Sequence, residues 1–223
     1  MIRALMLSFQ SLSDARVFVL LIKVVSLTLL VFAVSGVGLW YLLDALFAYA
    51  GWSDDGTLSA LASFALLLLS AVLLFRVVAV AITWIFADDI IDAVEHQDYP
   101  EHSKLGRRPG IASGAAMAVK SVARVIGYNL LALPIYLLLL ITGVGTAIAF
   151  LLINALLLGR DLEDMLVARH GKPHGSIAKL PRLLLGLLGT AGMLIPFVNL
   201  LVPVMATAMA VHLVHGSGKA AVA

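Results

Sequence analysis

The chain has 223 residues, of which 62% are hydrophobic and 13% are charged, and its formal net charge is +2. A soluble domain is about half apolar and about a quarter charged, so this composition, with a mean hydropathy of +1.06, indicates a membrane protein. The small net charge speaks against nucleic-acid binding, and the absence of cysteine excludes disulfides and cysteine-ligated metals.

Two apolar blocks in the first part of the chain are long enough to cross a membrane. The first covers residues 17–43 and contains Lys23, and the second covers residues 58–87 and is interrupted by Arg76. Both exceed the roughly 20 residues needed to cross a hydrocarbon core of about 30 Å. No small-residue cleavage site follows a short apolar core near the N-terminus, so we expect the first segment to stay in the mature protein. The sequence therefore predicts two transmembrane helices.

Charged residues in the connecting segments predict which side of the membrane each segment faces. The loop between the two helices carries Asp54 and Asp55 and no lysine or arginine, whereas residues 88–124 and 159–182 are rich in basic residues. By the positive-inside rule, the acidic loop faces outward and the two basic segments face the cytoplasm. Lys219 puts the C-terminal tail on the cytoplasmic side as well.

Two further apolar blocks, at residues 125–158 and 183–215, begin and end beside segments predicted to be cytoplasmic. Each block must therefore turn back, and each is about 33 to 35 residues long, or roughly 50 Å as one helix. Glycine permits the backbone angles of a tight reversal, and proline breaks a helix. The predicted hairpin tips contain Gly143 and Gly145 in the first block, and Pro196, Asn199 and Pro203 in the second.

The hairpin arms are short. Residues 146–158 and 183–195 each reach about 20 Å as helix, less than the roughly 30 Å hydrocarbon core. We therefore predict an all-α integral membrane protein, a single membrane domain over residues 1–223, with two transmembrane helices and two re-entrant or half-penetrating hairpins. In the alternative, the flanks at 112–124 and 160–182 extend the arms so that the hairpins cross the membrane.

Several stretches resemble one family of membrane proteins. Residues 154–171, NALLLGRDLEDMLVARHG, and residues 194–214, LIPFVNLLVPVMATAMAVHLV, are similar to the C-terminal half of the CysZ sulfate permeases, which belong to a wider etoposide-induced protein 2.4 family. Residues 86–101, FADDIIDAVEHQDYPE, also fit the family layout. The resemblance implies two long transmembrane helices, two membrane-inserted hairpins, a homo-oligomer, and sulfate uptake for cysteine synthesis across the bacterial inner membrane.

The entrance to the first membrane helix departs from the family pattern. The family's sulfate-handling stretch is a Gly-Leu-Arg sequence, and here the region reads Ser13-Asp14-Ala15-Arg16. Arg16 matches the arginine, but Asp14 adds a negative charge beside it. We therefore expect weak affinity for sulfate, and another small inorganic anion remains open as the substrate.

Five residues are candidates for anion binding or permeation, because positive or polar groups within membrane segments often mark an ion path. Each has a simpler interpretation: interfacial anchoring for the arginines at helix ends, snorkelling for the arginine within the second span, and stabilisation of the hairpin tip for the asparagine. The candidates are Arg16, Arg76, Arg124, Arg160 and Asn199.

Acidic and histidine residues elsewhere indicate no cofactor or enzyme. Asp92 and His96 have a spacing of four residues that a metal ion can use, but we interpret the acidic segment that contains them as a solvated cytoplasmic face. The interpretation covers Asp88, Asp89, Asp92, Glu95 and His96, and four other histidines, His170, His174, His212 and His215, are interpreted as membrane-interface residues. No constellation of a nucleophile and a base, phosphate loop or metal motif is present, so we expect no catalysis, metal or cofactor.

Two function classes remain. The first is a permease for sulfate or another small inorganic anion in the inner membrane, and any primary energy source would have to come from a partner. The second is a non-transporting scaffold whose hairpins shape the lipid bilayer or hold partners. Buried charges along one path favour transport, whereas hairpins packed only against lipid favour the scaffold.

Overall fold

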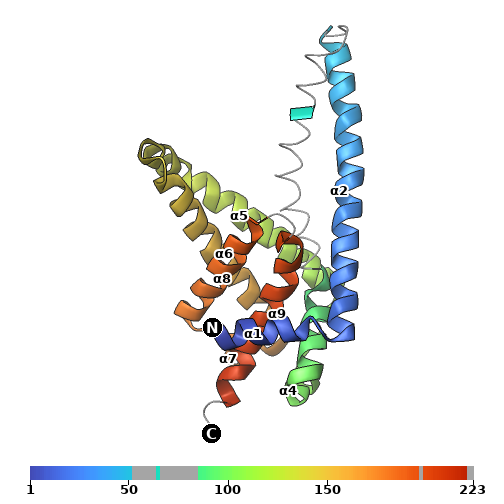
Figure 1. Cartoon of the computed structure of the whole chain (residues 1–223), viewed down its shortest axis with the longest axis vertical. Coiled ribbons are helices and arrows are strands. Elements are labelled where there is room, and N and C mark those ends of the chain that lie inside the picture. Colours follow the sequence, from blue (N-terminus) through green and yellow to red (C-terminus); the bar gives the residue numbers. More distant parts are fainter. Residues whose placement is uncertain (52–63, 66–84, 196–197, 220–223) are drawn as a thin grey trace.

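The computed structural model describes residues 1–51, 64–65, 85–195 and 198–219, and every regular element in these ranges is helical. One helical stretch covers residues 85–98. The named elements are α1 (Ile2–Ser11), α2 (Ala15–Tyr49), α4 (Pro100–Leu105), α5 (Ile111–Leu139), η1 (Leu140–Thr142), α6 (Gly145–His170), α7 (Lys172–Gly175), α8 (Lys179–Met193) and α9 (Val198–Lys219). Figure 1 labels the α-helices among them. The predicted all-α class is confirmed for the described residues.

Helix α2 starts directly after Asp14, which caps it. The Oδ1 atom of Asp14 accepts hydrogen bonds from the backbone amides of Arg16 at 2.8 Å and Val17 at 3.3 Å. Amides in the first turn of a helix have no partner inside the helix, so an N-cap carboxylate stabilises its start. The first turns of α2 are partly buried, whereas later side chains such as Tyr41 are exposed, and α2 extends away from the base of the bundle in Figure 1.

Helix α1 runs from the N-terminus across α9 to the start of α2 (Figure 1), and it is amphipathic. One face, which includes Ala4, Ser8 and Ser11, is buried and packs against α9. The opposite face exposes the apolar side chains of Ile2 and Met6. A helix with one packed face and one exposed apolar face suits the boundary between membrane and water.

The reversal between α5 and α6 is centred on Gly143, whose φ of 69° is a conformation that glycine adopts at little cost. The hydroxyl of Thr142 accepts a hydrogen bond from the amide of Gly145 at 2.8 Å. The first amide of α6 therefore has a hydrogen-bond partner. One turn further, the hydroxyl of Thr146 donates to the carbonyl of Tyr136 at 2.9 Å and joins the two arms. Helices α5 and α6 therefore form a hairpin.

Helices α6 and α8 pack at close range because glycine occupies their contact. A Cβ added at Gly186 of α8 would overlap the backbone carbonyl oxygen of Ala155, and one added at Gly159 of α6 would overlap that of Arg182. Small residues at such positions let two helix backbones approach each other. The two predicted hairpins are thus joined through α6 and α8.

Helix α9 occupies the centre of the bundle and contacts α1, α2, α6 and α8. It buries Val204, Ala208 and Val211 completely. Pro203 lies inside α9, where its carbonyl accepts a hydrogen bond from the hydroxyl of Thr207 at 2.9 Å. Asn199 lies in the first turn of α9, and its backbone amide donates to the carbonyl of Ile195 at 3.0 Å.

Four helical stretches are long and apolar enough to cross a membrane, at Ala15–Tyr49, Ala112–Thr142, Gly145–His170 and Val198–Gly216. Helices α5 and α6 therefore run beyond the predicted hairpin bounds of 125–158. Helix α8 has 15 residues and reaches about 22 Å, which is shorter than a hydrocarbon core of about 30 Å. Most of the predicted second span, including Arg76, lies outside the described residues, as does the tip residue Pro196.

Candidate functional site

A cluster of ionisable side chains is buried where residues 85–98 and the C-terminal parts of α6 and α9 meet. We call Asp92, Glu95, Arg169, His170 and His215 the buried ionic cluster. The side chain of Glu95 is 0% exposed and that of Arg169 is 1% exposed. A buried charge is tolerated when opposite charges and hydrogen bonds compensate it, so the partners within the cluster determine whether its members can be charged.

Arg169 bridges the two carboxylates of the cluster. Its Nε donates to Oε2 of Glu95 at 2.9 Å, and its Nη2 donates to Oδ1 of Asp92 at 2.6 Å. The guanidinium lies flat against Gly106, where a Cβ would come within 2.6 Å of Nε. The carbonyl of Arg169 accepts from the amide of Arg107 at 3.0 Å, which ties the end of α6 to the segment after α4. Arg169 therefore holds separate parts of the chain together.

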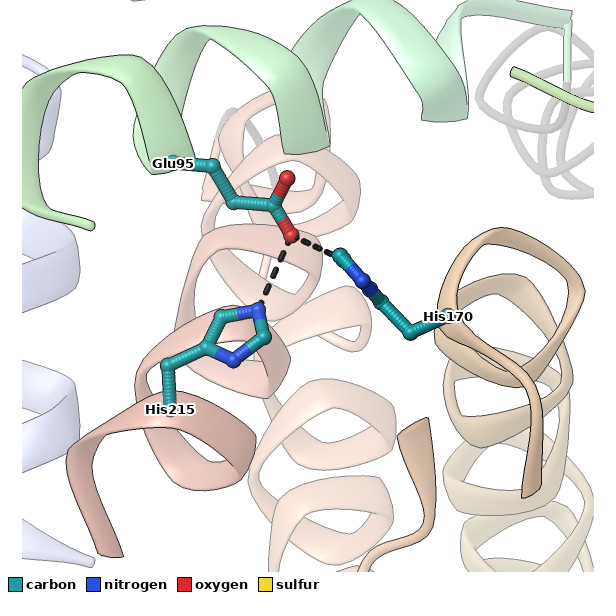
Figure 2. Close-up of side chains that lie close together, drawn as sticks. All are labelled: Glu95, His170 and His215. Carbon is teal, nitrogen blue, oxygen red and sulfur yellow. Dashed lines mark hydrogen bonds and ion pairs between the residues drawn. The ribbon is translucent and has the colours of Figure 1, made fainter. Parts of the chain in front are cut away.

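The other carboxylate oxygen of Glu95, Oε1, lies within hydrogen-bond distance of two histidine rings, as Figure 2 shows. The Nε2 atoms of His170 and His215 lie 2.5 Å and 2.9 Å from Oε1. Burial alone raises the pKa of Glu95, but the hydrogen bonds from both histidines and the charge of Arg169 outweigh it and lower the pKa to about 2. Glu95 is therefore a carboxylate at neutral pH, and the stability it contributes is present above its ordinary pKa and is lost as the pH falls toward 2.

Aromatic and hydroxyl groups surround the cluster on the side of α1. The hydroxyl of Tyr99 lies 3.1 Å from Nδ1 of His212, and the hydroxyl of Ser11 lies 3.0 Å from its Nε2. The ring of His102 stacks on that of His215, with centroids 4.2 Å apart. These contacts connect α1, α4 and α9 around the buried ionic cluster and fix the orientation of its rings.

A second polar group lies between α5 and α6. Arg124 pairs with Asp161 at 3.1 Å and with Asp164 at 2.8 Å, and the hydroxyl of Ser121 donates to Asp161 at 2.6 Å. Arg124, Asp161 and Asp164 border a cavity of about 200 Å³, which we call the Arg124 cavity. Its lining is completed by Lys120 and by apolar residues, namely Met117, Val167 and Ala168.

The predicted anion-site residues do not come together in one place. Arg16 is exposed at the start of α2, beside the Asp14 cap, and Arg160 is exposed on α6. Arg124 borders the cavity between α5 and α6, and Asn199 is half-buried at the start of α9. Of these four described candidates, Arg124 and Arg160 both interact electrostatically with Asp161, whereas Arg16 and Asn199 belong to other helices.

The interpretation of residues 88–96 as a solvated face is wrong for Glu95, and the interface interpretation is wrong for His170, His212 and His215, because the side chains of these four residues are buried. Only His96 of the predicted Asp92–His96 pair points outward, while Asp92 pairs with Arg169. One sequence signal was available: Glu95 follows Ile91 by one helical turn, and Ile91 is on the buried apolar side of that helix.

The exposed surface of the described helices is apolar over long stretches. Large side chains on α5 and at its turn are mostly exposed, including Leu131, Leu138 and Ile141, the last at 89%. Apolar patches of this extent are unfavourable in water. Together with four helices of spanning length and composition, they define an all-helical integral membrane protein.

The chain belongs to the sulfate transporter CysZ/etoposide-induced protein 2.4 family, whose model matches residues 4–203. This confirms the resemblance inferred from the sequence. The family fits a membrane transporter role and is not one of enzymes. No curated protein and no solved structure matched the chain in the corresponding comparisons.

Proposed function

We propose that this protein is a permease for a small inorganic anion, with sulfate or a related oxyanion as the substrate class. Family membership supports transport, and the observation that carries the anion is the Arg124 cavity, which brings two cationic side chains to a partly enclosed space between α5 and α6. Arginine within a membrane segment usually faces protein or a water path. Arg124 fits that description, since its side chain is 13% exposed.

The charges around the cavity suggest how an anion is held for a short time and then released. Arg124 is paired at rest with Asp161, which is buried, and with Asp164, which is more exposed. An anion that enters beside Lys120 can replace Asp164 as the partner of the Arg124 guanidinium. The guanidinium presents several donors in a fixed plane and can bind the anion and Asp161 at once. Asp161 keeps its bonds to Ser121 and to Arg124 throughout. When Asp164 pairs with Arg124 again, the anion is released. Conduction requires that the anion binds weakly enough to leave.

We propose that the second hairpin, whose first arm α8 is short, enters the membrane only partly, and that the protein forms a homo-oligomer in the bacterial inner membrane. The first hairpin supports the oligomer, because its tip exposes the apolar side chains of Leu140, Ile141 and Val144 around an irregular turn. Irregular backbone is unfavourable in lipid unless protein or water covers it. A neighbouring subunit would cover this turn.

Uptake of radiolabelled sulfate into proteoliposomes tests the transport proposal. We expect uptake by the wild type, a loss of at least about tenfold in Arg124→Gln, since a charge-assisted hydrogen bond is worth about 1.5–3 kcal/mol, and no loss in Lys104→Gln. Lys104 is a matched control because it forms an exposed pair with Glu101. Equal uptake by Arg124→Gln and the wild type, at equal folded yield, would remove the cavity from the path. Absence of uptake by the wild type would favour the scaffold.

A further inference from the structure

The buried ionic cluster contains three side chains whose ligand atoms converge from distant parts of the sequence. Glu95 comes from the helical residues 85–98, His170 is the last residue of α6, and His215 lies near the end of α9. One oxygen of Glu95 and one nitrogen of each ring all lie within 4.8 Å of one another. In Figure 2 both rings point at the same carboxylate. Imidazole and carboxylate together are common ligands of zinc and similar ions.

The spacing of these atoms is close to that of a metal site. The two Nε2 atoms lie 2.5 Å and 2.9 Å from Oε1 of Glu95. Ligands about 2.0–2.1 Å from a tetrahedral zinc ion are about 3.3 Å apart. To hold an ion at that spacing, Oε1 of Glu95 must move away from each Nε2 atom by less than about 1 Å.

The charge around the cluster favours a cation. Asp89, Asp92 and Glu95 carry three negative charges, and they are joined by ion pairs to two positive charges, on Arg108 and Arg169. One negative charge therefore remains before the histidines are counted. Neutral imidazole rings add no charge. The remaining negative charge therefore partly compensates the charge of a divalent cation at the three ligand atoms.

The surroundings also orient the ligands, as outer groups do in metal sites. Arg169 holds Oε2 of Glu95 at 2.9 Å, which leaves Oε1 directed at the two rings. His102 stacks on the ring of His215, and the ring of His170 meets that of His215 edge-on at 5.0 Å. Arg169 and His102, which are not proposed ligands, therefore help to hold Glu95 and His215 in place.

We propose that Glu95, His170 and His215 form a binding site for one divalent transition-metal ion of the zinc type, with water in the fourth position. The site joins residues 85–98 to the ends of α6 and α9, so the ion fixes both hairpins to the segment that follows the second predicted span. Binding to the folded state alone stabilises that state in proportion to the logarithm of the metal concentration. The inference is independent of anion transport and uses none of the residues that line the Arg124 cavity.

Metal titration of the purified full-length protein tests this site directly. The protein is prepared without a polyhistidine tag and stripped with a chelator. Cobalt(II) is then titrated while visible absorption is recorded, and zinc(II) binding is measured by calorimetry. The chain has no cysteine, so thiolate ligands cannot contribute. We expect one ion per chain, a tetrahedral cobalt spectrum, and a higher melting temperature with zinc.

Glutamine variants separate ligation from hydrogen bonding. His170→Gln and His215→Gln keep an amide donor for Glu95 but remove the imidazole ligand, and we expect metal affinity to fall by more than about 100-fold, because outer-sphere partners alone are worth about 10–100-fold. His96→Gln is the matched control, since His96 lies beside Glu95 in sequence but is exposed. We expect no change in this variant.

Three results would overturn the proposal. The first is absence of metal binding by the folded wild type. The second is equal affinity in His96→Gln and in a folded His170→Gln or His215→Gln variant. If neither glutamine variant folds, X-ray absorption of the zinc-loaded wild type decides the question: two imidazole ligands support the site, and a metal shell without imidazole excludes it.

Discussion

Asp14 places a negative charge beside Arg16 at the start of the first membrane helix, and Asp14→Asn tests what that charge does. The carboxylate caps α2 by accepting from the amides of Arg16 and Val17. Asparagine is an equally good N-cap, so the variant keeps the cap and removes only the charge. If Arg16 attracts the anion at this end of the helix, the variant should bind sulfate more tightly.

The expected gain follows from Coulomb's law. A sulfate held by Arg16 and the start of α2 would lie about 5 Å from the Asp14 carboxylate. At that distance in water, the two negative charges of sulfate and the one of Asp14 repel each other by about 1.7 kcal/mol. Screening at physiological salt, with a Debye length of about 8 Å, reduces this to about 0.9 kcal/mol. The half-saturating sulfate concentration should therefore fall about fourfold, since about 1.4 kcal/mol corresponds to tenfold.

The assay is sulfate uptake into proteoliposomes over a range of sulfate concentrations, at low and at high ionic strength. Glu101→Gln is the control, because Glu101 is an exposed acid on α4 and its loss changes the net charge by the same amount. We expect no effect in the control, and a smaller effect of Asp14→Asn at high salt. Identical half-saturation in Asp14→Asn and the wild type at low salt would refute an anion site at the start of α2.

Three further predictions concern packing, assembly and topology. Gly186→Ala should lower the free energy of unfolding by about 1–3 kcal/mol, the usual cost of overpacking, as measured by thermal melting in detergent. Gly38→Ala is the control and should have no effect, because open space surrounds Gly38. Equal melting temperatures of the two variants would contradict the tight contact of α6 and α8. Val144→Cys in this cysteine-free chain should form disulfide-linked dimers in native membranes if the hairpin tips meet between subunits, and exclusively monomeric protein after mild oxidation would count against that. Asp54→Cys should react with an impermeant thiol reagent only from outside the cell, and labelling from the cytoplasm alone would reverse the predicted orientation.

Local sequence features predicted much of the fold. The apolar run at 17–43 lies within α2, and Gly143 lies at the reversal between α5 and α6. Both depend on residues close in sequence: helix length follows from composition, and a tight reversal needs a residue that tolerates positive φ. The start of α5 and the end of α6 were harder to predict, because residues outside the apolar block, such as Arg124 just before it, also belong to these helices.

The buried ionic cluster could not be predicted from the sequence. Glu95 stands in a run of acidic residues that is typical of a solvated helix, and its partners Arg169 and His215 are 74 and 120 positions away. Only tertiary contact reveals that their charges compensate one another. Arg124 is a similar case, since its partner Asp161 belongs to the opposite arm of the hairpin.

The glycine contacts between α6 and α8 limit how this protein can change shape. Transport by alternating exposure requires some helices to move past others, but α6 and α8 pack so closely that a Cβ added at Gly159 or at Gly186 would overlap the backbone of the other helix. We therefore expect the pair to move as one unit. Among the described residues, we expect opening and closing motion in the lightly packed helices α2 and α5, the second of which belongs to the least buried of the four candidate spans.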